Sequence, residues 1–139
     1  MNILITGAKG FVGRNLTETF KNIRDGKDKT RNIDSSVTIF EYDLDTPKEK
    51  LDKYCSEADF VFHLAGVNRP KNEKEFMDGN FGFTSELLDL LKKHNNKAPI
   101  LITSSIQAAL DNPYGKSKKA GEDLIFRYGA DNDVKTLVY

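Results

Sequence analysis

The stretch that decides the fold runs from residue 3 to residue 13 and reads ILITGAKGFVG. Its first residues, Ile3, Leu4 and Ile5, form a short apolar run that is typical of a strand covered on both faces in a parallel sheet. Glycines follow at positions 7, 10 and 13, and apolar residues then recur at positions 12, 16, 20 and 23. This spacing predicts a helix that begins near Gly10 and ends around residues 25–26.

The turn between this strand and this helix is a candidate phosphate-binding site. Gly7 allows a tight turn, Gly10 lets the backbone approach a pyrophosphate, and Gly13 permits close packing of the helix on the strand. Unpaired N–H groups and the positive end of the helix dipole then face the phosphate oxygens. Three glycines alone are a weak signal, but their place between a first strand and an amphipathic helix favours a dinucleotide site. The cofactor-binding residues expected here are Gly7, Lys9, Gly10, Phe11, Val12 and Gly13.

The rest of the chain alternates strands with helices. Strands are predicted at residues 37–44, 60–64, 100–102 and 134–139, and helices at residues 47–54, 80–94 and 114–128. This alternation, without hairpin signals, predicts a doubly wound parallel α/β sheet of the Rossmann-like kind, in three α/β/α layers. We expect one domain over residues 1–139. Because the chain stops inside an apparent strand, we expect a fragment truncated before the last strands and a substrate subdomain.

Composition excludes several classes of protein. The 139 residues carry 21 basic and 21 acidic side chains, so no net field draws the chain to nucleic acid or to an anionic membrane. No apolar run approaches the length of a membrane span, and the N-terminus lacks the pattern of a signal peptide. The single cysteine, Cys55, cannot form an internal disulfide, as expected in a reducing compartment. We therefore expect a cytoplasmic protein.

Candidate ligand contacts also follow the second and third strands. Asp43 is placed to accept hydrogen bonds from an adenine amino group, while Leu44 packs on the ring. A helix N-cap system at the neighbouring Asp45 is compatible with this interpretation. His63 is interpreted as a packed residue rather than a catalytic one. The third strand has a bare end where the cofactor is expected to lie, formed by Leu64, Ala65 and Gly66.

The later part of the chain carries a candidate catalytic group. Ser104 and Ser105 follow the strand at residues 100–102, at the edge where doubly wound folds bind ligands. Tyr114 and Lys118 stand four residues apart on a predicted helix, so they share one face about one turn apart. This spacing alone arises by chance in a lysine-rich chain. The order of glycine turn, bare strand end, serine and Tyr–Lys pair is what gives it weight.

These motifs together resemble the extended short-chain dehydrogenase/reductases over all 139 residues. The segments at residues 7–15, 60–70 and 104–122 resemble more closely the bacterial capsule-synthesis reductases of the CapF type. That resemblance implies reduction of a 4-keto UDP-sugar on the route to UDP-N-acetyl-L-fucosamine. In those enzymes a zinc-binding cupin domain follows the reductase domain, and none of it is present in this sequence.

The resemblance also implies roles for single residues. Tyr114 corresponds to the acid that protonates the carbonyl oxygen as hydride arrives from the nicotinamide. A free phenol has a pKa of about 10, which the Lys118 ammonium would lower, and Lys118 would also hold the nicotinamide ribose. Ser105, in preference to Ser104, would orient the carbonyl. Asn80 matches a cofactor-contact position of the family. No metal ligand is implied.

The cofactor preference rests on a departure from the family pattern. The interval from Gly13 to Asp43 is short, so we expect one strand–helix element to be trimmed, and the acid that binds a ribose 2′-hydroxyl cannot be placed. Lys9 suits a 2′-phosphate instead, as do Lys27, Lys29 and Arg31. We therefore expect NADP(H) rather than NAD(H).

The function expected from these features is an NADPH-dependent reductase of a 4-keto nucleotide sugar, in capsular or surface polysaccharide biosynthesis. A 4-epimerase of the same family, which would retain NAD(H), and a non-catalytic NAD(P)-binding module are the alternatives. Ile106 and Gln107 stand where family dehydratases carry an Asp-Glu pair, which argues against dehydration. The family also implies a homodimer through the helices that carry Tyr114 and Asn80. By itself the chain is expected to bind cofactor and to turn over little.

Overall fold

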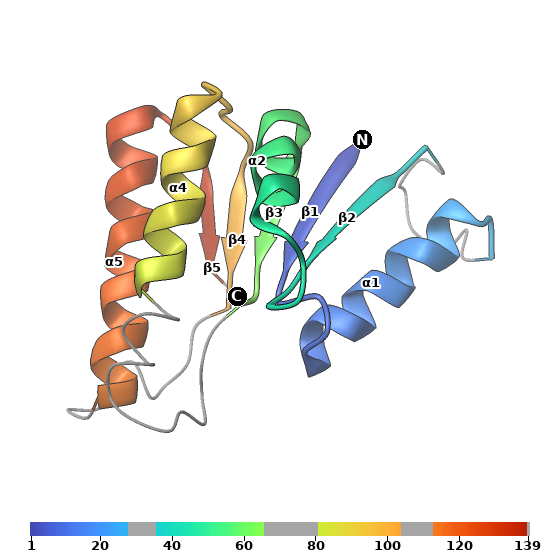
Figure 1. The fold of residues 1–139 in the computed structure, drawn as a ribbon, viewed down its shortest axis with the longest axis horizontal. Coiled ribbons are helices and arrows are strands. Elements are labelled where there is room, and N and C mark those ends of the chain that lie inside the picture. The colour runs from blue at the N-terminus through green and yellow to red at the C-terminus, as the bar shows by residue number, and fades with distance from the viewer. Residues whose placement is uncertain (28–35, 66–80, 104–112, 139) are drawn as a thin grey trace.

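The structure is a computed structural model that describes residues 1–27, 36–65, 81–103 and 113–138 (Figure 1). Its elements are β1 (Asn2–Thr6), α1 (Phe11–Arg24), β2 (Thr38–Tyr42), α2 (Lys48–Glu57), β3 (Phe60–His63), α4 (Phe83–Lys93), β4 (Ile100–Ile102), α5 (Pro113–Asn132) and β5 (Thr136–Val138). Within these residues the strands form one sheet in the order β2-β1-β3-β4-β5, and every neighbouring pair is parallel.

The first strand lies inside the sheet because its apolar run leaves no face for solvent. In β1, Ile5 stands opposite Glu41 of β2 on one side and Phe62 of β3 on the other. Ile3, Leu4 and Ile5 are at most 1% exposed, as expected for a strand covered on both faces.

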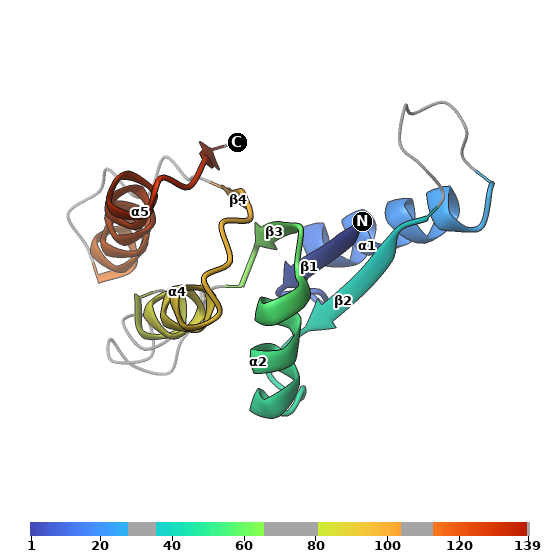
Figure 2. The ribbon, with the colours of Figure 1, turned by 90° about the horizontal axis from the view of Figure 1, so that it is seen from above.

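Helices cover both faces of the sheet, which confirms the predicted doubly wound, three-layer architecture (Figure 2). On one face α1 buries Phe20 and Ile23 against Ile3 and Ile5 of β1. On the other face α2, α4 and α5 pack together over a larger apolar cluster. The buried side chains that these three helices contribute to it include Leu51, Cys55, Leu87, Leu88, Leu91, Ile125 and Tyr128.

The last helix runs further than the sequence pattern predicts. It was predicted to end at Tyr128, but α5 continues to Asn132. A Cβ on Gly129 would lie 2.7 Å from the Thr136 side chain and 2.8 Å from the Val134 carbonyl oxygen. The glycine therefore allows the helix to approach the segment that leads into β5, and it does not end the helix.

The second strand directly follows the first helix and pairs with β1. The chain thus leaves β1 toward β2 on one side and toward β3 on the other. In open α/β sheets such a reversal of direction places the ligand crevice at the carboxyl ends of the central strands. Figure 1 shows these strand ends at one edge, together with the beginnings of α1, α4 and α5. Among the described residues no helix combines the length and apolar character needed to cross a membrane.

Candidate nucleotide-binding and catalytic site

The glycine turn is built so that side chains cannot replace two of its glycines. Gly7 has φ +71°, and a Cβ there would lie 2.8 Å from the Ala65 backbone nitrogen at the end of β3. A Cβ on Gly13 would lie 2.1 Å from the Gly7 carbonyl oxygen. A Cβ on Gly10 would meet only that same oxygen, at 3.3 Å. The first and third glycines thus pack the turn, while the second leaves its backbone open to a ligand.

The beginning of α1 fits an anion. The N-cap residue Gly10 provides no side-chain cap, and the first turn contains no acidic residue. The first N–H groups of the helix therefore remain available together with the positive end of its dipole. Phe11 and Val12 flank this position and are 85% and 53% exposed, although both are apolar. This arrangement is complementary to a pyrophosphate beside an apolar ligand surface.

The turn after β2 brings three charged residues together, and we call Lys9, Asp43 and Asp45 the outer group. The Asp43 carboxylate accepts hydrogen bonds from the backbone N–H of Lys9 at 2.8 Å and from that of Leu44 at 2.7 Å. Leu44 itself is fully exposed, so its side chain is available to pack on a ligand. Asp43 directly follows β2, the strand beside β1, so an acid stands at the end of this strand.

The predicted 2′-phosphate contact of Lys9 has a competitor. The Lys9 ammonium forms an ion pair with the Asp45 carboxylate. This contact raises the pKa of Lys9 and lowers the pKa of Asp45. A 2′-phosphate that used Lys9 would therefore have to replace Asp45. Lys27 ends the described segment after α1, and Lys29 and Arg31 lie outside the described residues.

The end of β3 is held by a buried hydrogen-bond chain. The His63 ring lies between the hydroxyls of Thr6 and Thr84, at 2.8 Å from each, so it joins β1, β3 and α4. The Thr6 hydroxyl also accepts a hydrogen bond from the Ala65 backbone N–H at 3.3 Å. Burial, with a smaller contribution from Lys118, lowers the pKa of His63 to about 4. His63 is therefore neutral at pH 7, in agreement with its interpretation as a packed residue.

A small cavity lies beside this chain of hydrogen bonds. It is lined by His63, Ala65, Thr84, Ile102, Thr103, Lys118, Gly121, Glu122 and Ile125. These residues come from the ends of β3 and β4 and from α4 and α5, at the edge of the sheet where the glycine turn opens. Burial lowers the pKa of Lys118, while the Glu122 carboxylate opposes this effect. We call His63, Lys118 and Glu122 the cavity group.

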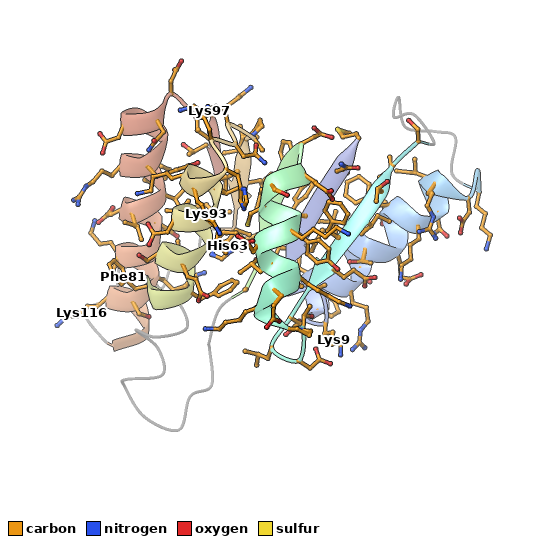
Figure 3. All side chains as sticks on the ribbon, turned by 45° about the horizontal axis from the view of Figure 1, so that its top comes forward. Lys9, His63, Phe81, Lys93, Lys97 and Lys116 are labelled. Carbon is orange, nitrogen blue, oxygen red and sulfur yellow. The ribbon has the colours of Figure 1, made fainter. Side chains whose placement is uncertain are left out.

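The predicted catalytic residues are only partly covered by the structure. Tyr114 lies in the first turn of α5, one turn before Lys118, and its side chain is not among those described. Ser105, Gly66 and Asn80 lie outside the described residues. In Figure 3, Phe81 and Lys116 lie near the beginnings of α4 and α5. Among the described residues, no group of three His, Cys, Asp or Glu side chains is arranged to hold a metal ion.

Residues 3–139 match the NAD dependent epimerase/dehydratase family. The chain belongs to this family. Family membership agrees with the glycine turn and with the position of Lys118 at the same edge of the sheet. It also agrees with the expected resemblance to the extended short-chain dehydrogenase/reductases, which is thereby confirmed.

Two relatives place the chain more closely within the family. It is 38% identical over 131 residues to UDP-2-acetamido-2,6-beta-L-arabino-hexul-4-ose reductase of Pseudomonas aeruginosa, covering 94% of this chain and 32% of the relative. It is 43% identical, with a TM-score of 0.79, to the capsular polysaccharide assembling protein CapF of Staphylococcus aureus, covering 100% of this chain and 35% of that protein.

A second solved structure carries a cofactor. RMD from Pseudomonas aeruginosa, complexed with NADPH, is 26% identical with a TM-score of 0.74, and the match covers 99% of this chain and 52% of that protein. The chain thus spans about a third of the length of the curated reductase and of CapF, and about half that of RMD.

Three residues that the structure brings to this site were not predicted from the sequence. Thr6 and Thr84 anchor His63, and Glu122 lines the cavity with Lys118. The Lys118–Glu122 spacing of four residues was a usable signal, because it places both side chains on one helix face. The pairing of Thr84 with His63 had no such signal, since 21 residues separate them in the chain.

Proposed function

We propose that this chain is the cofactor-binding and catalytic portion of an NADPH-dependent reductase that acts on a 4-keto nucleotide sugar. The observation that carries the proposal is the position of Lys118, which lines a cavity at the carboxyl edge of the sheet where the glycine turn opens. Tyr114 lies one helical turn before it. The 38% identity to a UDP-sugar 4-ulose reductase supports this choice of substrate class.

The residues present fit a dinucleotide. The turn from Gly7 to Gly13 would hold the pyrophosphate, because Gly10 leaves its backbone open and α1 has no side-chain cap. Asp43 and Leu44 would hold the adenosine, while Leu64, Ala65, Gly66 and Asn80 would line the path to the nicotinamide. When bound, NADPH supplies the hydride for the reduction.

The chain's own groups supply the proton and the orientation. Tyr114 would donate its phenolic proton to the carbonyl oxygen of the sugar, and Ser105 would orient that carbonyl. The Lys118 ammonium would lower the pKa of the Tyr114 phenol from its usual value of about 10, which brings proton donation within reach of neutral pH. Lys118 would also hold the nicotinamide ribose.

One observation favours a second candidate, a 4-epimerase of the same family. Lys9 is paired with Asp45, and Asp43 follows the strand next to β1. An acid at this position suits the 2′-hydroxyl of NAD(H), the cofactor that an epimerase would retain. We nevertheless propose NADP(H), because Lys9 would bind its 2′-phosphate once that phosphate has displaced the exposed Asp45 carboxylate.

The proposal also covers the domain organisation, the cellular role and the oligomeric state of the protein. Residues 1–139 would form one cofactor-binding domain, and the enzyme would act in capsular or surface polysaccharide biosynthesis in the cytoplasm. A homodimer would form through α4 and α5, which pack side by side. Phe126 on α5 is 43% exposed although it is apolar. Light scattering of the purified protein would measure its oligomeric state.

A cofactor titration tests the proposal most directly. The chain contains no Trp, so the fluorescence of a reduced nicotinamide can be followed without interference. We expect NADPH to bind the 139-residue chain more tightly than NADH, and the full-length protein to oxidise NADPH when a 4-keto UDP-sugar is added. Tight binding of NADH with no NADPH oxidation would favour the epimerase. Absence of binding by either nucleotide would refute both enzymes.

A further inference from the structure

The cavity group contains a buried carboxylate oxygen that the proposed reaction does not use. Oε1 of Glu122 is buried and has no hydrogen-bond partner among the described residues. Buried polar atoms in folded proteins are nearly always paired, so such an atom calls for an explanation. Glu122 lies one turn after Lys118 on α5, and both side chains line the same cavity.

The charged and titratable groups that line this cavity around Lys118 are few. His63 comes from β3 and is neutral, and Glu122 comes from α5. The lining residues from α4 and β4, and from the turn after β4, are Thr84, Ile102 and Thr103. Glu122 is therefore the single anionic side chain in the described lining that can stabilise a charged Lys118.

The two groups interact without a direct ion pair. Among the ion pairs of the described residues, α5 has one between Lys119 and Asp123 at 3.3 Å, but none between Lys118 and Glu122. The cavity that both side chains line has a volume of about 20 Å³, which is enough for one water molecule. A single water can bridge a carboxylate and an ammonium that lie beyond direct contact.

We propose that Glu122 is a positioning residue, whose carboxylate, with Oε1 buried, holds the Lys118 ammonium in this cavity, through one bridging water, at the sheet edge beside the first turn of α5. The proposal rests on the proposed function for the role of Lys118 in the reaction. It requires, however, only that Glu122 governs the charge and placement of Lys118. Burial lowers the pKa of Lys118, and Glu122 acts against that effect. Loss of the carboxylate therefore leaves a larger fraction of Lys118 neutral at a given pH.

The experiment is competitive acetylation of the 139-residue chain at a series of pH values, read for each lysine by mass spectrometry. Only the neutral amine reacts, so the midpoint of the labelling curve follows the pKa of each lysine. In Glu122→Gln we expect the Lys118 midpoint to move to lower pH while that of Lys119 stays in place. Glu122→Asp, which keeps the charge but draws it back by one methylene, should give a smaller shift.

The matched control is Asp123→Asn. It removes a carboxylate with the same four-residue spacing from a lysine on the same helix, but at an exposed position. It should leave the Lys118 midpoint unchanged. Equal Lys118 midpoints in Glu122→Gln and the unmodified chain would overturn the proposal. If Glu122→Gln does not fold, Glu122→Asp decides in the same way, because its Lys118 midpoint must lie below that of the unmodified chain.

Turnover separates this inference from the proposed function. In the full-length enzyme Glu122→Gln should lower kcat by roughly tenfold or more, with a smaller change in the KM for NADPH, since misplacing a catalytic group slows the chemical step. A shifted Lys118 midpoint in a protein that reduces no 4-keto sugar would refute the proposed function and leave the placement of Lys118 by Glu122 standing. An unshifted Lys118 midpoint in an enzyme that reduces the 4-keto sugar would refute the role of Glu122 and leave the proposed function standing.

Discussion

The outer group and the cavity group lie at the same edge of one sheet, yet they hold their charges in opposite ways. In the outer group Lys9 and Asp45 pair on the surface, with 63% of each side chain exposed. In the cavity group His63 is buried and neutral, and Lys118 is partly buried. Water screens the first pair strongly and the second group weakly. A charge change should therefore alter ligand preference at the outer group, but rate or stability at the cavity group.

The largest effect is expected beside the cavity group, from Tyr114→Phe. Removing the phenolic proton should lower kcat of the full-length enzyme by about 10²–10⁴-fold, which is the usual contribution of a general acid, while NADPH affinity is retained. Stopped-flow measurement of NADPH oxidation gives the rate, and fluorescence titration gives the affinity.

Tyr128→Phe is the matched control for this prediction. It removes a tyrosine hydroxyl from the same helix, where that hydroxyl donates a long 3.4 Å hydrogen bond to the Asn96 carbonyl oxygen. Its rate should stay close to that of the unmodified enzyme. If Tyr114→Phe kept full activity, another group would have to be the proton donor.

The glycine turn joins the two groups, so its disruption should affect both. In Gly13→Ala the new Cβ would lie 2.1 Å from the Gly7 carbonyl oxygen, and the backbone must move. We expect a loss of about 3 kcal/mol in the free energy of unfolding, at the upper end for overpacking, with loss of dinucleotide binding. Urea denaturation and NADPH titration measure the two effects.

Gly26→Ala separates packing from backbone conformation. Gly26 has φ +75°, but beyond its chain neighbours no atom lies within 4 Å of the place where a Cβ would stand, so alanine there is strained without a clash. The substitution should cost roughly 1 kcal/mol and leave NADPH binding unchanged. Equal destabilisation by both variants would contradict the packing role of Gly13.

Acid should weaken the fold through His63. Its pKa in the folded chain is about 4, below the value of 6.5 for an unfolded histidine, so the unfolded state binds the proton first. This contribution to stability is complete above pH 6.5 and is lost as the pH falls from 6.5 to about 4, to a total of about 3 kcal/mol. Urea denaturation at pH 7, 5.5 and 4.5 measures it.

His63→Asn should be less stable than the unmodified chain at pH 7, because the contacts with Thr6 and Thr84 are disturbed, but it should lose less stability on acidification. His94→Gln provides the control, since His94 bonds to Asp52 outside the cavity. It should keep the acid-dependent loss that His63 causes. An unchanged pH dependence in His63→Asn would show that other groups govern acid sensitivity.

The smallest effect is expected in the outer group, from Asp45→Asn. Release of Lys9 should raise NADPH affinity by about two- to fivefold and leave NADH affinity nearly unchanged, because an exposed ion pair is weak. Fluorescence titration with both nucleotides measures the ratio. Asp25→Asn, which removes an exposed carboxylate paired with Arg24 at the far end of α1, should leave the ratio unchanged. A rise in NADH affinity equal to that for NADPH would exclude a 2′-phosphate contact.

The sequence was most informative where one local pattern fixed the backbone. The apolar run at residues 3–5 and the glycines at 7, 10 and 13 predicted β1, the turn and α1, because sterics and helical period act over a few residues. The end of α5 was not fixed in this way: the helix runs four residues past the predicted Tyr128, and Gly129 stands inside it. A glycine that ends a helix and one that lets a helix approach a strand look alike until the strand is in place.

The order of the residues along the chain determined that this is a doubly wound sheet with a glycine turn at its ligand edge, since periodicity and glycine geometry are local properties. Only the tertiary structure decided which charges face each other there. Lys9 meets Asp45 across 36 residues, and His63 meets Thr6 across 57. Such contacts depend on strand order and burial, which bring distant side chains into one dielectric environment and thereby set their protonation and strength.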